Sequence, residues 1–356
     1  MNSSDIARQR LHHQRIMPPT CETPHAVVSW MGAMQAQDYY QAVWAIGARI
    51  PSATLQTIEQ AIENGEILRT WPQRGTIHWV APEHIKWMLQ LGAARMIARD
   101  AQRLAQLDLD VPVMQRIEPI FREALAGKKR LTRVQMFEVL GNAGIHTNNQ
   151  RGYHILWYMA QTGVICIGPM RGKEQTFALL DDWTPNTPIL PREEALAALA
   201  KLYFTSHGFA TIHDFAWWTG LTITEARKGF ESIKSQFVSE TIGKKTYWMH
   251  ADHTAPPDHP RGVVLLPGFD EYLLGYQDRS DVLDPLHASK VVPGGNGVFF
   301  PMIVIDGQIE GTWKRTIKRD KVIITRDTFR PLTDQKRAEF EIAAQRYAAF
   351  HGLVLA

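Results

Sequence analysis

The chain has 356 residues, of which 45% are hydrophobic and 21% are charged, and this balance excludes a disordered polypeptide and leaves room for two to four modules with buried cores. A formal net charge of +3 permits binding to nucleic acid but does not establish it. Two cysteines exclude a disulfide framework, no apolar run could span a membrane, and the start MNSSDIARQR lacks a signal-peptide core, so we expect a cytoplasmic protein with no membrane partner.

The first eighty residues predict helices followed by a hairpin. Ser4 and Asp5 open a helix over 4–16, and Thr23 as N-cap with Pro24 behind it opens a second helix over 23–34. A third helix is predicted over 52–67. The segment ILRTWPQRGTIHWV then reads as two short strands around the turn PQRG, because it is rich in β-branched and aromatic residues.

The same order recurs twice further along the chain. After a helix predicted over 82–104, helices over 112–125, 132–144 and 150–163 lead into a hairpin over 164–180. Helices over 192–208, 211–220 and 222–233 lead into another hairpin over 236–249. Short helices followed by a two-stranded hairpin are typical of a winged helix-turn-helix, which most often engages nucleic acid, although some only bind other proteins.

The C-terminal part changes character. A proline-bearing linker over 250–262 precedes three strand-like segments, GVVLLPGFDEYLLGY, GVFFPMIVIDGQIEGTWKR and DKVIITRD, with a DG turn in the second. A helix over 333–352, capped by Thr333 or Asp334, ends the chain. We expect an α+β protein with three tandem winged helix-turn-helix units at 1–95, 96–188 and 189–252, followed at 253–356 by a small β-barrel or curled sheet with a terminal helix.

Two glutamines stand where the helix over 23–34 stops. If the backbone is extended beyond Met34, Gln35 and Gln37 point to the same side and Ala36 points away. A glutamine carbonyl is not a base at neutral pH, but it can orient a water and direct its dipole at a developing positive charge. From these residues alone, buried or capping glutamines that satisfy local backbone groups are the competing interpretation.

A family resemblance bears on this choice. The three helix–hairpin units and the stretches MQAQDYY, RTWPQRGTIHWV, GPMRGKEQTF and LLPGFDEYLLGYQDRS resemble the AlkZ/YcaQ-like winged-helix DNA glycosylases, from about residue 5 to about residue 350. The resemblance implies that the tandem winged helices and the β-barrel form a C-shaped body around a DNA channel. It also implies that Gln35-Ala36-Gln37 is the glutamine-x-glutamine motif at the concave centre.

The resemblance further implies the chemistry. Alkylation at N3 or N7 makes a purine cationic and a good leaving group, so little general-acid help is needed. Gln35 and Gln37 would orient the attacking water and stabilise the oxocarbenium-like sugar. No lysine stands beside the pair, which predicts a monofunctional glycosylase without a Schiff-base lyase step. We expect no cofactor, no metal and no obligate protein partner, and double-stranded DNA with alkylated or crosslinked bases as the substrate.

Other residues are predicted to support this site. Asp38 and Tyr39 follow the motif directly, and Arg74 and His78 lie on the first hairpin, although His78 is better explained as an ordinary strand residue. Basic hairpin tips suit contacts with phosphates or the minor groove. The candidates at these tips are Arg171, Lys173, Lys244 and Lys245.

Two alternatives remain open from the sequence. The protein could be a non-enzymatic winged-helix DNA-binding protein or transcriptional regulator, with structural glutamines. The adjacent acids Asp270 and Glu271 could instead belong to an acid-dependent hydrolase or a metal enzyme. Neighbours in a strand point to opposite faces, however, so we expect these two carboxylates not to converge and to serve the structure.

Overall fold

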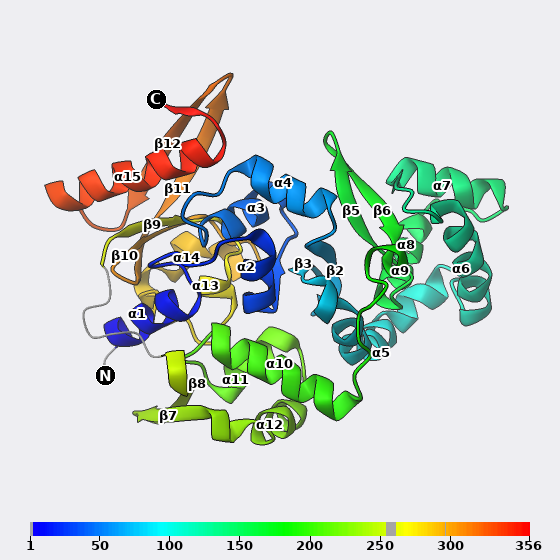
Figure 1. The fold of residues 1–356 in the computed structure, drawn as a ribbon, viewed down its shortest axis with the longest axis horizontal. Helices are drawn as coiled ribbons and strands as arrows, with labels where there is room; N and C mark the ends of the chain where they lie inside the picture. Colours follow the sequence, from blue (N-terminus) through cyan, green and yellow to red (C-terminus); the bar gives the residue numbers. More distant parts are fainter. Residues whose placement is uncertain (1–2, 254–260, 296) are drawn as a thin grey trace. The chain divides into compact units, whose positions relative to one another are not determined.

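The computed structural model describes residues 3–253, 261–295 and 297–356 (Figure 1). The chain divides into two compact units, one made of residues 59–195 and the other assembled from residues 1–58 and 196–356. The boundaries lie within α4 (Leu55–Glu63) and α10 (Arg192–Ser206). Most of the expected linker over 250–262 falls on residues 254–260, outside the described residues. None of the helices described is both long and apolar enough to cross a bilayer.

The unit of residues 59–195 holds the first two predicted hairpins. Its elements are β2 (Leu68–Gln73), β3 (Thr76–Val80), α5 (Pro82–Gln106), α6 (Val111–Leu125), β4 (Leu131–Thr132), α7 (Arg133–Asn142), α8 (Arg151–Gln161), β5 (Ile165–Arg171), β6 (Glu174–Leu179) and α9 (Leu180–Trp183). Within this unit the strands lie in the order β3-β2-β5-β6-β4, and α5 and α8 pack against β2. Arg74 and Gly75 both have positive φ, which a tight two-residue hairpin turn requires.

The other unit begins with α1 (Ser3–His13), α2 (Pro24–Met31), β1 (Ala33–Gln35) and α3 (Tyr39–Gly47). It resumes with α10, α11 (Ile212–Thr219), α12 (Ile223–Glu231), β7 (Phe237–Ile242) and β8 (Lys245–His250), the predicted order of helices and hairpin. The helix starts follow from capping, since the hydroxyls of Thr23, Thr211 and Thr222 each accept a backbone N–H of the first turn. The predicted cap at Thr23 is confirmed.

The C-terminal sheet belongs to this second unit. Its strands, in the order β13-β12-β11-β10-β9, are β9 (Val263–Leu266), β10 (Met302–Ile305), β11 (Gln308–Lys318), β12 (Lys321–Thr328) and β13 (Val354–Leu355). Helix α15 (Asp334–Phe350), capped by Thr333, packs against β9, β12 and β13 through a buried face that includes Phe340 and Tyr347 (Figure 1). The expected α+β fold with a curled C-terminal sheet and a terminal helix is confirmed.

Short helices fill the connections of this unit. They are α13 (Glu271–Leu274), α14 (Ala288–Val291) and the 3-10 turns at Lys234–Gln236, Ala251–His253, Pro285–His287 and Pro293–Gly295.

Two sequence predictions need correction, and one helix was missed. The strand expected to run through GVVLLPGFDEYLLGY ends at Leu266, because Phe269 has a positive φ and Asp270 caps α13 by accepting the Tyr272 N–H at 2.9 Å. The helix predicted over 23–34 ends at Met31, where Gly32 adopts a φ of 77° that favours glycine. Helix α3 was not predicted, because Ala42 to Ile46 are all buried and leave no amphipathic stripe.

Candidate active site

The two glutamines lie at the end of β1. Gln35 is the last residue of the strand and is half-buried, Ala36 is 0% exposed, and Gln37 is exposed. The buried alanine therefore separates two amide side chains that both reach solvent. This arrangement gives carbonyl oxygens access to a water and to a bound substrate, and neither glutamine is sealed in an apolar interior.

Asp38 and Tyr39 serve the helix that follows. The Asp38 carboxylate is the N-cap of α3 and accepts the backbone N–H and the side-chain amide of Gln41, both at 3.2 Å. Tyr39 is half-buried and makes an edge contact with the ring of Tyr40, which is 43% exposed. The capping role explains why an aspartate stands at position 38, and its exposed carboxylate also adds negative charge next to Gln37.

A buried carboxylate lies directly behind the motif. Glu271 is 1% exposed, and its Oε1 accepts the backbone N–H of Gln35 at 2.8 Å. Its Oε2 accepts the indole N–H of Trp218 at 2.8 Å and lies 3.7 Å from Nε2 of His207. Burial lowers the pKa of His207, so this imidazole is neutral at neutral pH.

The neighbouring acid has a different partner. Asp270 accepts the Arg49 guanidinium through both carboxylate oxygens, at 2.9 and 3.0 Å, and both side chains are fully buried. Arg49 also donates to the carbonyl and side-chain oxygens of Gln14 at 2.9 Å. Asp270 and Glu271 therefore point to separate partners, as expected, and all their oxygens are engaged. This arrangement speaks against an acid-pair or metal enzyme built on them.

A cavity of about 300 Å³ opens beside Asp38. Asp38, Gln41 and Trp44 line it from α3, at a spacing of three residues that puts them on one side of the helix. The sheet and the terminal helix complete the lining with Pro267, Phe300, Pro301, Thr312, Trp313, Lys314, Arg315 and Tyr347. Aromatic side chains and both signs of charge line the cavity, and Asp38 in this lining directly follows Gln37 in the chain.

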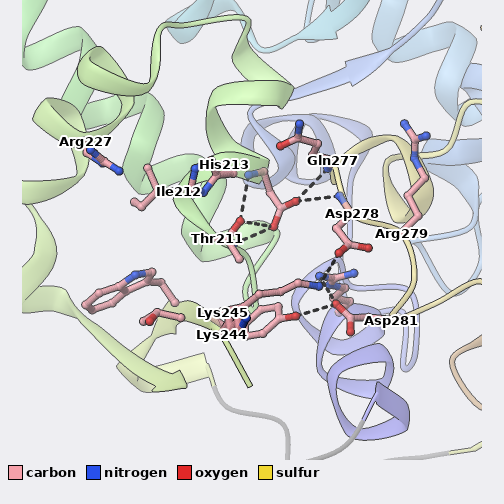
Figure 2. A pocket seen from close by; sticks show the side chains of 15 residues that line it. Thr211, Ile212, His213, Arg227, Lys244, Lys245, Gln277, Asp278, Arg279 and Asp281 are labelled. Carbon is pink, nitrogen blue, oxygen red and sulfur yellow. Dashed lines mark hydrogen bonds and ion pairs between the residues drawn. The ribbon is translucent and has the colours of Figure 1, made fainter. Parts of the chain in front are cut away.

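The predicted basic tip at Lys244 and Lys245 borders a larger cavity of about 720 Å³. Figure 2 shows Arg227 and His213 contributed by helices and Lys244 and Lys245 contributed by the hairpin. Lys244, His213 and Arg227 are exposed, whereas Lys245 forms an ion pair with Asp278. Asp214, Asp278 and Asp281 also line this cavity, and among its cations Lys244 and Arg227 are the exposed ones that an anionic group from solvent can reach.

The Lys245–Asp278 pair keeps both groups charged. Partial burial alone would lower the pKa of the Lys245 ammonium, but the hydrogen bond to Asp278 and the negative charges of Asp278, Asp281 and Tyr247 together raise this pKa. Burial alone would raise the pKa of the Asp278 carboxyl. The hydrogen bonds from Lys245 and Ser280, together with the charge of Lys245, lower this pKa to about 2. Lys245 is therefore held by the protein, while Lys244 extends from the same turn.

The remaining predicted residues belong to the unit of residues 59–195. Arg74, in the β2–β3 turn, lines a cavity of about 380 Å³ with Arg99 and the half-exposed Tyr153. His78 is fully buried, with Nδ1 2.9 Å from the Thr76 carbonyl oxygen, so it does not face solvent and is the strand residue that we favoured.

At the β5–β6 tip, the two predicted cations differ. Arg171 bonds the Gln135 side chain at 3.0 Å and the Arg130 carbonyl at 2.8 Å, so this guanidinium fastens the hairpin to the start of α7. Lys173, in the turn itself, is exposed. Among the described residues, no group of three or more His, Cys, Asp and Glu side chains is placed to hold a metal ion.

Comparison with known proteins decides the family. The family model described as DNA glycosylase AlkZ-like matches residues 28–350, which include the glutamine motif and Glu271. The chain belongs to the AlkZ-like DNA glycosylase family. As a member it is a DNA repair glycosylase, an enzyme that acts on N-glycosyl bonds, and the resemblance noted from the sequence is confirmed.

One sequence match and one structural match illustrate the similarity. The chain is 27% identical to an interstrand DNA cross-link repair glycosylase of Streptomyces sahachiroi over 355 residues, covering 92% of this chain and 90% of the relative. The solved structure of Streptomyces sahachiroi DNA glycosylase AlkZ matches with a TM-score of 0.83 at 23% identity, covering 100% of this chain and 99% of that one. The structural match shows that the two proteins share a fold.

Sequence reasoning missed the buried partners of the glutamine motif. Glu271 bonds to Gln35, and Trp218 bonds to Glu271. Both residues lie far along the chain from Gln35, and no local sequence pattern links them to it. The buried ion pair of Arg49 was also missed, because an arginine after an apolar segment is usually a solvated residue. The sequence offered one signal for the start of α3, the spacing Asp38-x-x-Gln41, in which the carboxylate of a helix cap accepts both N–H donors of Gln41.

Proposed function

We propose that this protein is a monofunctional glycosylase that hydrolyses the N-glycosidic bond of alkylated or crosslinked purines in double-stranded DNA, with the attacking water oriented by Gln35 and Gln37. The observation that carries the proposal is the end of β1, where two neutral amides reach solvent while the backbone beneath them is buried and bonded. The crosslinked substrate is supported by the relative named for interstrand cross-link repair.

The chemistry suits neutral amides. A purine alkylated at N3 or N7 carries positive charge, so the C1′–N bond breaks as the electron pair moves into the base, and positive charge develops on the sugar. The carbonyl dipoles of Gln35 and Gln37 stabilise that charge and direct a water oxygen at C1′. The water then loses a proton to solvent. No lysine occurs between residues 24 and 47, so the segment that carries the motif supplies no amine for a Schiff base.

An assay on defined lesions tests the function. Purified protein is incubated with a duplex that contains one N7-methylguanine and, separately, with a duplex crosslinked between purine N7 atoms. We expect free methylated base and an abasic site that breaks only after alkali treatment, and release of the crosslink to single strands. Strand breaks without alkali would contradict the monofunctional mechanism. Binding of one undamaged sequence with no base released from either duplex would favour a transcriptional regulator.

We propose that DNA is held by the helix–hairpin units acting as winged helices, with Lys173 and Lys244 on phosphates. Both lysines are exposed at hairpin turns, and Lys244 shares its cavity with Arg227 and His213. Phosphate contacts of this kind position the duplex without selecting a base sequence. Lys245 and Arg171 act differently, since Asp278 holds the first and Gln135 the second, so their main contribution is to fix the tips.

Substitution of these lysines has a measurable signature. In K173A and in K244A we expect the slope of log Kd against log salt concentration to fall by about one, because each lost phosphate contact releases one fewer counterion. The base-release rate at saturating protein should stay at the wild-type value. K201A, which removes an exposed lysine of α10, is the matched control. A slope in K173A or K244A equal to that of K201A would exclude the phosphate contact.

A further inference from the structure

We propose that Glu271 is a positioning residue for the reaction, because its buried carboxylate fixes the backbone that carries Gln35. The inference rests on the proposed function, since it assigns the means by which the motif is held. Glu271 does not reach solvent and therefore does not touch DNA, so its effect passes through Gln35.

The contact is specific at the level of single atoms. Oε1 of Glu271 accepts the Gln35 backbone N–H at 2.8 Å, while Oε2 accepts the Trp218 indole N–H at 2.8 Å. Trp218 is 0% exposed and lies in α11, so the second oxygen ties the carboxylate to a packed helix. Each oxygen thus has its own donor, and the first donor belongs to the glutamine motif.

Burial of a carboxylate at this position is unfavourable in free energy. Transfer of an ionised group out of water is unfavourable unless hydrogen bonds replace its hydration, and neutral His207 at 3.7 Å supplies no countercharge. The nearby cation Arg49 is engaged with Asp270. Glu271 gains in return two charge-assisted hydrogen bonds, which are shorter and stronger than neutral ones. A glutamine could not accept both, because its amide nitrogen would face one of the two N–H donors.

The consequence for Gln35 is geometric. Holding its N–H fixes the plane of the preceding peptide, and the buried neighbours Met34 and Ala36 fix the chain on both sides. The direction of the Cα–Cβ bond of Gln35 is then set, and with it the position from which the carbonyl oxygen can reach a water. Displacement of a reacting group by about 1 Å costs on the order of 100-fold in rate.

Three variants separate positioning from packing. E271A removes both acceptors, and E271Q keeps the side-chain volume and one acceptor oxygen but replaces the other by a donor. Y272F is the matched control, because it removes a neighbouring buried hydroxyl that donates to the carbonyls of Ala7 and Gly307 and leaves both oxygens of Glu271 with their donors. All three variants remove buried hydrogen bonds of one unit, so all three are expected to lower the midpoint of urea unfolding.

The variants are compared under conditions where each is folded, by single-turnover release of N7-methylguanine and by Kd for the lesion duplex. We expect the rate to fall on the order of 100-fold in E271A and about tenfold in E271Q, with Kd little changed. Y272F should keep a rate close to wild type despite its lower stability. Amide hydrogen exchange of Gln35 gives a second readout, with fast exchange in E271A and E271Q and protection in Y272F.

The outcomes distinguish this inference from the proposed function. A folded E271A or E271Q with the wild-type rate overturns the positioning role, and so does a Y272F rate that falls as far as that of E271A. In those cases the catalytic role of the glutamines stands, provided that Q35A abolishes base release. If Q35A itself retains full base release, the proposed function fails. The exchange rate of the Gln35 amide still reports whether Glu271 holds the strand.

Discussion

Replacing Gln35 and Gln37 together by alanine is expected to abolish release of N7-methylguanine while leaving DNA affinity close to wild type. Each amide contributes a dipole aimed at charge that develops only in the transition state, and loss of one such group typically costs about 100- to 1000-fold in rate. Both side chains reach solvent, so their truncation leaves no buried cavity and the unfolding midpoint should stay unchanged.

The measurement is single-turnover base release together with Kd on the lesion duplex. The single variants Q35A and Q37A show whether the two amides contribute separately or as one unit, since groups that orient the same water lose activity non-additively. Q56A is a matched control, because Gln56 is an exposed glutamine of α4 outside the motif. Full base release by the double variant would leave the glutamines as structural residues and remove the mechanism proposed above.

The second large effect concerns stability. Replacing Arg49 by methionine is expected to lower the free energy of unfolding by about 3–5 kcal/mol, because it leaves the Asp270 carboxylate buried without its partner. The guanidinium also bonds the carbonyl and side-chain oxygens of Gln14 and the Ala45 carbonyl, and methionine can satisfy none of them. Because α1, α3 and α13 all meet at this arginine, the loss should affect the whole unit.

Urea unfolding measures this loss, with R337M as the control. Arg337 pairs with Asp334 at 2.6 Å on the exposed side of α15, and such surface pairs contribute about 0–1 kcal/mol. Replacing both members of the buried pair, Arg49 by methionine and Asp270 by asparagine, should recover part of the stability because no unpaired charge remains. A destabilisation in R49M no larger than that in R337M would show that the buried pair is dispensable.

Local chemistry explains which parts of the fold were predictable. Helix starts at Thr23 and Thr333 follow from side-chain caps that any helix needs, and the turn at Arg74-Gly75 follows from the positive φ of a tight hairpin. Helix α3 escaped prediction because Ala42 to Ile46 are all apolar and leave no alternation with polar positions. The short helix at Glu271 escaped because a left-handed Phe269 and a capping Asp270 interrupt what reads as a strand.

The candidate site was likewise predictable only where it depends on neighbouring residues. The glutamine pair could be proposed from the sequence, because its spacing and a family resemblance both concern adjacent residues. The role of Asp270 and Glu271 could not, since the partners of these acids, Arg49 and Gln35, lie 221 and 236 positions away. Contacts of that range depend on how the whole unit folds. Similarly, the spacing at Lys244-Lys245 does not reveal that Asp278 holds only one of the two lysines.

The division of one compact unit between residues 1–58 and 196–356 has a consequence for biosynthesis. When a ribosome has synthesised the first two hundred residues, both glutamines are already present. Trp218 and Glu271, whose side chains hold the strand of Gln35, have not yet been made. The motif therefore acquires its fixed backbone only late in translation. Fragments that end before residue 271 should contain the glutamine motif but should not release the base.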